Sequence, residues 1–180
     1  MINNDILDKI ERIKVNLTET DVLDKLLDRM RWPKNYLFGQ PSVEAIKEDG
    51  TKHQDFFDED GYLNSAKAIK CYEEGYSLIL SNIGGFNRET FLIQETLNHY
   101  FKKIINCNFY FGNGLKSTSF DKHSHEYPVI VKNIYGQSKW VIAEKELILN
   151  GQDVIWFDKN TDHQVVKIYD AKLSMTCNID

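Results

Sequence analysis

Three of the five histidines in this chain are the residues best suited to chemistry. His123 and His125 are two residues apart in a segment rich in β-forming residues, HSHEYPVIVKN. Because side chains alternate between the faces of an extended strand, both imidazoles are expected on the same face. There they would supply two ligands to one metal ion. His163, which follows the segment IWFDKNTD, is the best candidate for the third.

A hydrogen-bonded histidine pair is the alternative interpretation of this short motif. An inward-facing imidazole without a partner would cost roughly 1 to 3 kcal/mol, and backbone groups, Asp121 or Glu126 could satisfy it as well as a metal. The second half of the pattern favours the metal. Residues 154–157 have strand character and 158–162 a turn, so a strand that begins at His163 can return beside the histidine pair.

The first part of the chain must form helices and loops around this site. Apolar residues recur at helical spacing over residues 5–30, and Thr18 followed by Asp21 resembles a helix cap, so two helices are expected. Residues 34–72 are broken by proline and glycine, which indicates irregular structure and a candidate substrate lid.

The remaining residues predict a β-rich core. A strand is expected over residues 76–83, then a helix capped by Asn87 that covers about 88–105. After Cys107 the apolar period changes from 3.6 to 2. Short strands with turns between them favour a sandwich or barrel such as the jelly roll. The β segments expected after Cys107 are residues 108–111, 128–134, 139–143, 146–149, 154–157, 164–169 and 173–177.

Composition limits the classes of protein and partner. A chain of 180 residues with 42% hydrophobic residues is expected to form one domain, 1–180, with an N-terminal region at 1–72 and a β core at 75–177. The net charge of −5, without a Lys/Arg-rich run, argues against a nucleic-acid partner. The N-terminus does not resemble a signal peptide, and no apolar run approaches the roughly 20 residues of a membrane span. Three widely spaced cysteines fit the cytoplasm.

The chain resembles the cupin superfamily, specifically its JmjC-like branch, over roughly residues 75–177. The resemblance implies a fold that is mainly β with N-terminal helices, built on a double-stranded β-helix (jelly-roll) barrel. It also implies an Fe(II) ion that binds 2-oxoglutarate and O2 and serves to hydroxylate a substrate C–H bond. The positions that match the family's frame in type and spacing are His123, Asn133, Gly136, Trp140, Asp153 and His163.

Two positions depart from the pattern of that branch. His125 stands where the family has an aspartate ligand, which would make a three-histidine site. Ser138 stands where the family has the lysine that grips the far carboxylate of 2-oxoglutarate. The neighbouring Lys139 points the other way in a regular strand. Other cupins use three histidines in dioxygenases and isomerases that do not need 2-oxoglutarate, so the cosubstrate stays open.

Further polar residues on β segments are candidates for contact with a cosubstrate or substrate. For each of them, a hydroxyl or amide that bonds elsewhere, or a lysine in solvent, is the alternative. Tyr127 and Asn133 would share the face of the histidine pair in a regular strand. The candidates are Tyr110, Ser119, Tyr127, Asn133, Lys139, Lys167 and Thr176.

The function expected is therefore a metal-dependent cupin enzyme, a non-haem Fe(II) oxygenase of JmjC-like ancestry, with His123, His125 and His163 as ligands. Another first-row divalent metal is the alternative to Fe(II). The expected substrate is a small molecule or a protein or peptide, and the sequence leaves the oligomeric state open, with a homodimer as one candidate. Three other functions stay open: a non-catalytic binding or interaction module, a three-histidine enzyme independent of 2-oxoglutarate, and a structural β domain without metal.

Overall fold

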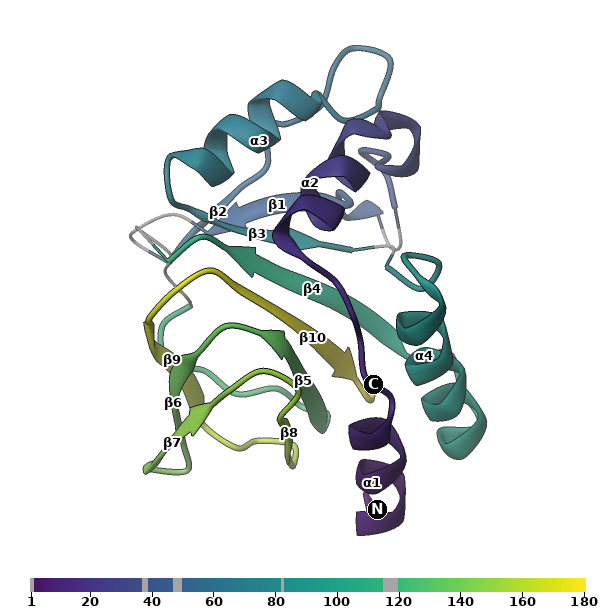
Figure 1. The fold of residues 1–180 in the computed structure, drawn as a ribbon, viewed down its shortest axis with the longest axis vertical. Coiled ribbons are helices and arrows are strands. Elements are labelled where there is room, and N and C mark those ends of the chain that lie inside the picture. The colour runs from purple at the N-terminus through teal and green to yellow at the C-terminus, as the bar shows by residue number, and fades with distance from the viewer. Residues whose placement is uncertain (1, 37–38, 47–49, 82, 115–119) are drawn as a thin grey trace.

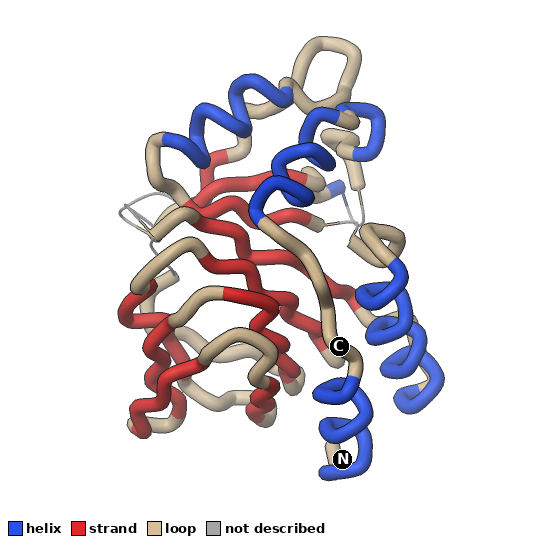
Figure 2. Tube along the Cα trace, in the orientation of Figure 1, coloured by secondary structure: helices blue, strands red, loops and turns tan. Residues whose placement is uncertain are grey.

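Among the residues that it describes, the computed structural model of the chain, shown in Figure 1, has four α-helices and ten strands. It describes residues 2–36, 39–46, 50–81, 83–114 and 120–180. The strands form two antiparallel sheets, with helices on one side of the larger sheet (Figures 1 and 2). The helices are α1 (Asn4–Arg12), α2 (Glu19–Leu27), α3 (Ser65–Glu73) and α4 (Arg88–Phe101), with a short 3-10 helix at Arg29–Arg31.

The larger sheet has seven strands and the smaller sheet three. In the larger sheet the order is β2-β1-β3-β4-β10-β5-β8, and in the smaller one it is β7-β6-β9. The larger sheet comprises β1 (Val43–Ile46), β2 (Lys52–His53), β3 (Ser77–Leu80), β4 (Asn106–Gly112), β5 (Val129–Tyr135), β8 (Val154–Phe157) and β10 (Lys172–Asn178). The smaller comprises β6 (Ser138–Ile142), β7 (Lys145–Leu149) and β9 (His163–Ile168).

The large sheet has two differently covered faces, because residues alternate along each strand. In β5, Ile130 and Ile134 face the helices and join the main core. Val129 and Val131 face the opposite way, where they pack with Trp140 and other residues of the small sheet. The large sheet therefore separates a helix-packed core from a space enclosed between the two sheets.

The helix ends follow the local sequence. Thr18 and Asp21 form the predicted capping box at the start of α2, and Asn87 caps α4 by accepting a hydrogen bond from the backbone of Thr90 at 2.9 Å. The fourth helix ends at Phe101 and not near residue 105 as predicted, because Lys102 adopts a left-handed conformation with φ +55°.

Two details of the β structure differ from the sequence-based expectations. Strands β1 and β2 lie within residues 34–72, which were expected to be irregular, and all four residues of β1 are buried beside β3. Residues 123–133 do not form one strand, because β5 begins only at Val129. His123 instead makes an isolated antiparallel bridge with His163.

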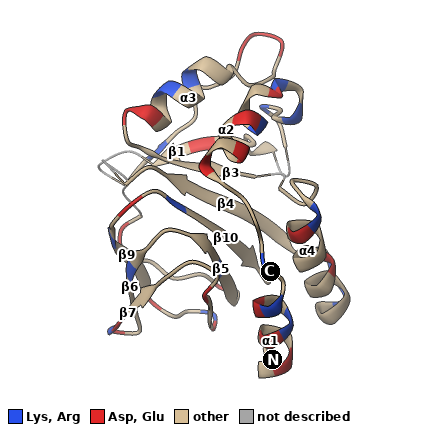
Figure 3. Ribbon diagram, viewed as in Figure 1, with Lys and Arg blue, Asp and Glu red and all other residues tan. Residues whose placement is uncertain are grey.

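Charged side chains lie mainly on the helices and the connecting segments, whereas β4, β5 and most of β10 carry few (Figure 3). Within the part of the chain that the structure describes, no helix is both long and apolar enough to span a membrane.

Gly136 lies in the turn between β5 and β6, where the chain passes close to the backbone at the start of β10. Its φ is +79°, and a Cβ atom there would lie 2.8 Å from the Cα of Lys172 and still closer to the carbonyl oxygen of Ala171. We expect Gly136→Ala to lower the free energy of unfolding by about 2 kcal/mol, because strain and a clash with rigid backbone add together. Urea unfolding monitored by circular dichroism measures the effect.

Gly61→Ala is the matched control, since Gly61 also has a positive φ, +82°, but a Cβ atom there would meet nothing within 4 Å. It should cost only the conformational strain. Equal losses in the two variants would show that the backbone of β10 moves aside and that the close approach at Gly136 adds nothing.

Candidate metal centre

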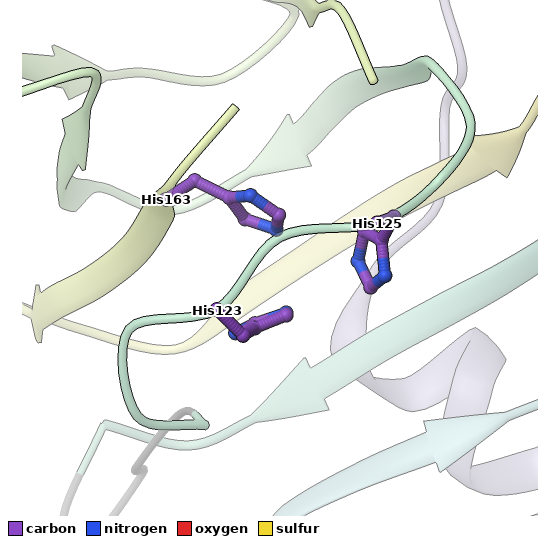
Figure 4. A group of neighbouring side chains, drawn as sticks. All are labelled: His123, His125 and His163. Atoms are coloured by element: carbon purple, nitrogen blue, oxygen red, sulfur yellow. The ribbon is translucent and has the colours of Figure 1, made fainter. Parts of the chain in front are cut away.

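The three histidines come from two segments that the fold places side by side (Figure 4). His123 and His125 lie in the segment before β5, and His163 is the first residue of β9. The backbones of His123 and His163 are joined by two hydrogen bonds, of 2.9 and 3.2 Å. One ligand nitrogen from each imidazole lies within 4.8 Å of the others. Three donors are thus gathered around one point.

Backbone carbonyl groups orient two of the imidazoles. The Nδ1 atom of His123 lies 2.7 Å from the carbonyl oxygen of Asp121, and that of His163 lies 2.9 Å from the carbonyl oxygen of Thr161. A carbonyl oxygen only accepts hydrogen bonds, so we assign the ring proton to Nδ1 in both residues. The unprotonated Nε2 atoms are then available, which is the usual arrangement of a histidine that binds a metal.

Aromatic rings hold the histidines from the side. Phe157 packs against His163 with ring centroids 4.2 Å apart, and Tyr127 stacks on His125 at 5.1 Å with nearly parallel planes. His163 is buried, whereas His123 and His125 are partly exposed. The site is therefore apolar around His163 and more open around the other two.

Burial favours the neutral form of His125 and His163 by lowering the pKa of each. Desolvation, followed by the proximity of His123 and His125, lowers the pKa of His163 to about 4. Desolvation also lowers the pKa of His125, and the charge of His123 adds to this effect. Neutral imidazole is the form that binds a metal, so these two residues need not lose a proton near pH 7 to bind one.

The donor set fits a first-row divalent ion. Three imidazole nitrogens suit iron, cobalt, nickel, copper or zinc, and three protein ligands leave coordination positions open for other molecules. The cluster found among the described residues contains no carboxylate, so its ligands bring no negative charge to a bound ion.

The histidines line a cavity of about 400 Å3 between the two sheets. Three of the predicted contact residues, Tyr110, Tyr127 and Thr176, line it as well. Burial raises the pKa of both tyrosines, so their hydroxyl groups stay neutral and can donate hydrogen bonds. A cavity of this size accommodates a small ligand.

The other predicted contact residues lie elsewhere. Lys139 pairs with Glu146 at 2.8 Å, and Lys167 is exposed over the ring of Tyr169. Asn133 is buried, but it donates a hydrogen bond to the backbone of Gly136 and, like the two lysines, does not line the cavity. Ser119 lies outside the described residues.

Lys172 is one of the cavity residues that the sequence-based reasoning missed. It is buried, and its Nζ atom lies 5.3 Å from the centre of the Trp140 ring. Ser138, the position where the JmjC-like branch has a lysine, is buried too and accepts a hydrogen bond from the indole of Trp140. Strand alternation from Thr176 could have found Lys172, but the predicted strand began one residue later.

Comparison with known proteins adds information on the fold. No family model matches the sequence, and neither does any curated protein. YcfD, a ribosomal oxygenase from Escherichia coli, is structurally similar over 91% of this chain and 44% of its own, with a TM-score of 0.56 and 10% identity. A structure of YcfD in complex with cobalt and succinic acid matches over the same shares, with a TM-score of 0.55 and 11% identity.

A cupin superfamily protein from Desulfitobacterium hafniense matches a smaller part, 41% of this chain and 65% of its own, with 8% identity and a TM-score of 0.38. The match to YcfD covers 44% of that protein, so this chain spans less than half of its length. At these identities the likeness concerns the fold alone. The predicted fold class is confirmed: the protein is mainly β with N-terminal helices and has the double-stranded β-helix of the cupins.

Proposed function

We propose that the protein is a metal-dependent cupin enzyme, a non-haem Fe(II) oxygenase with His123, His125 and His163 as its ligands. The observation that carries the proposal is the convergence of three imidazoles, with ligand atoms within 4.8 Å of one another, on the wall of a cavity. Two of these imidazoles have their Nδ1 atoms fixed by backbone carbonyl groups. Such fixation is the support that metal-binding histidines need.

The protein residues would hold the ion and control access to it. The buried His163 and its neighbour Phe157 limit water on one side, while the partly exposed His123 and His125 leave the other side open. When bound, Fe(II) would supply the redox chemistry for reaction with O2. Three neutral ligands leave the full charge of the ion in place, which favours an anionic ligand in the cavity.

We propose 2-oxoglutarate as the cosubstrate. YcfD, which shares the fold, is described as an oxygenase and has been seen with cobalt and succinic acid. Succinate is what remains of 2-oxoglutarate after oxidative decarboxylation, so a dicarboxylate beside a divalent metal is consistent with this chemistry. The cavity volume of about 400 Å3 suits such a ligand, together with part of a small-molecule or peptide substrate.

A second candidate function is a three-histidine cupin enzyme that does not use 2-oxoglutarate. The observation that favours it is the cluster itself, because the described residues add no carboxylate to the three imidazoles. The two candidates share the metal and differ in the cosubstrate.

Metal analysis and a turnover assay test the proposal. We expect the protein, loaded with Fe(II) without oxygen and then desalted, to retain about one ion per chain by mass spectrometry of the metal. On addition of O2, ascorbate and 2-oxoglutarate, we expect slow release of succinate even before a substrate is known. Protein that retains no divalent ion would refute the metal site. Protein that retains iron but releases no succinate would support the second candidate function.

A further inference from the structure

Lys172 is a buried cation for which the described residues provide no carboxylate partner. It begins β10 and is only 4% exposed. Its ammonium group lies 5.3 Å from the centre of the Trp140 ring, a contact that offsets only part of the lost hydration. Lysine is almost never buried this deeply without an ion pair, because loss of hydration penalises the charge. Such a position is costly to the fold and calls for an explanation by function.

The other charged residues around the cavity neutralise each other. The Nζ atom of Lys52 lies 2.8 Å from a carboxylate oxygen of Glu44, and Gln54 donates a hydrogen bond to the other oxygen. Burial alone, with no contribution from a neighbouring charge, lowers the pKa of Lys172 to about 8. Lys172 therefore stays mostly protonated near pH 7 and is the cation facing the cavity that the described carboxylates leave unpaired.

The surroundings of Lys172 suit an anion. Across the β4–β10 ladder, Lys172 is opposite Gly112, and Ser174 is opposite Tyr110. All four residues line the cavity. Gly112 has no side chain to fill the space beside the ammonium group. The hydroxyl groups of Ser174 and Tyr110 are potential hydrogen-bond donors to a carboxylate.

Lys172 lines the same cavity as the three histidines. The Trp140 ring that it contacts belongs to β6, two residues before Ile142. Ile142 is the partner of His163 across the β6–β9 ladder. The Trp140 ring and His163 thus lie two residues apart along the β6–β9 ladder, and a molecule bound in the shared cavity can contact both the imidazole cluster and the ammonium group.

We propose that Lys172 binds the far carboxylate of a short dicarboxylate, such as 2-oxoglutarate, whose other end binds at the three histidines. This inference rests on the proposed metal site, and it assigns to β10 the cation that is missing from Ser138 on β6. The cavity then has two positive poles, the ion and Lys172. It selects ligands with an anionic group at each end over those with only one.

Ligand binding to Co(II)-loaded protein tests the proposal without any turnover. We expect Lys172→Met to weaken the binding of 2-oxoglutarate about 10- to 100-fold, measured by calorimetry and by the visible spectrum of Co(II), because a charge-assisted hydrogen bond is lost. Pyruvate keeps the 2-oxo acid group but lacks the far carboxylate, so its affinity should not change. Lys172→Arg should retain most of the affinity for 2-oxoglutarate.

Lys167→Met is the matched control, because Lys167 is an exposed lysine on β9, the strand that precedes β10 in the chain. It should bind 2-oxoglutarate like the wild type. Thermal unfolding of each variant verifies that it is folded. If Lys172→Met and the wild type bind 2-oxoglutarate equally, or if pyruvate loses as much affinity as 2-oxoglutarate, the proposal is wrong.

Glutarate and the metal-free protein separate this proposal from that of the metal site. Glutarate has two carboxylates but no 2-oxo group, and its binding can be followed by protein NMR without a metal. We expect weak binding to the wild type and at least about tenfold weaker binding to Lys172→Met. If Lys172→Met binds glutarate more weakly than the wild type but neither protein takes up Co(II), the metal site is refuted and the role of Lys172 is supported. Co(II) uptake with no difference in glutarate or 2-oxoglutarate binding would refute only the role of Lys172.

Discussion

Replacement of His163 by alanine is expected to weaken the binding of Co(II) or Zn(II) at least about 100-fold, since even the loss of a group that supports a ligand costs 10- to 100-fold. His163 is the buried member of the cluster, and its ring is fixed by the carbonyl group of Thr161. Without it, two partly exposed imidazoles remain, which is one donor fewer than such sites use. Competition with a chromophoric chelator measures the affinity.

Two further variants control for changes in the fold. His99 is exposed on α4, far from the cluster in sequence, and His99→Ala should bind metal like the wild type. His125→Asp keeps three ligands and should still bind one ion, because carboxylate oxygen can replace imidazole nitrogen at first-row metals. Wild-type affinity in a folded His163→Ala protein would remove the basis of the proposed function.

Lys172→Met is expected to stabilise the protein at pH 7 by about 3 kcal/mol, the free energy that corresponds to the lowered pKa of the lysine. Burial lowers this pKa from 10.5 in the unfolded chain to about 8 in the folded protein. Methionine is similar in length, carries no charge, and can maintain contact with the Trp140 ring. Urea unfolding of the two proteins at several pH values measures the difference.

The difference between the two proteins should depend on pH in a defined direction. Below pH 8, Lys172 is protonated in both the folded and the unfolded state, so the full cost of burial applies. Between pH 8 and 10.5 the unfolded chain binds more protons than the folded protein, so the wild type becomes more stable relative to the variant as pH rises. The advantage of methionine should therefore decline over this range and vanish above it.

Measuring both proteins at each pH cancels the titration of groups that they share. Tyr110 and Tyr127 also line the cavity, but burial raises the pKa of both. Equal stability of the two proteins at pH 7 would mean that the ammonium group of Lys172 is hydrated or already paired. A difference that grows with pH would contradict the lowered pKa.

The sequence by itself determined the fold class and the residues of the candidate metal site. The change of apolar period after Cys107 and the closely spaced turns are local signals, and they were sufficient to predict a β-rich half. The caps at Thr18 and Asn87 are local too, and both helices begin as predicted. His123, His125 and His163 stood out by type and spacing, without any knowledge of strand pairing.

The route by which the histidines meet was decided only by the tertiary structure. A regular strand was expected to carry His123 and His125 on one face, but β5 begins after both residues. The two segments are instead held together by the bridge between His123 and His163, which are forty positions apart in the chain. A contact of this kind depends on the packing of the whole domain and leaves no local pattern.

Side-chain direction in the cavity was likewise decided by the register of the strands. Asn133 and Lys139 had plausible positions in sequence but bond outside the cavity, whereas Lys172, at the edge of a predicted strand, faces into it. Because side chains alternate, a shift of one residue in the pairing of two strands reverses every inward and outward assignment. Residue types and spacing can therefore be read from the chain, but which polar groups share a cavity depends on pairings between distant strands.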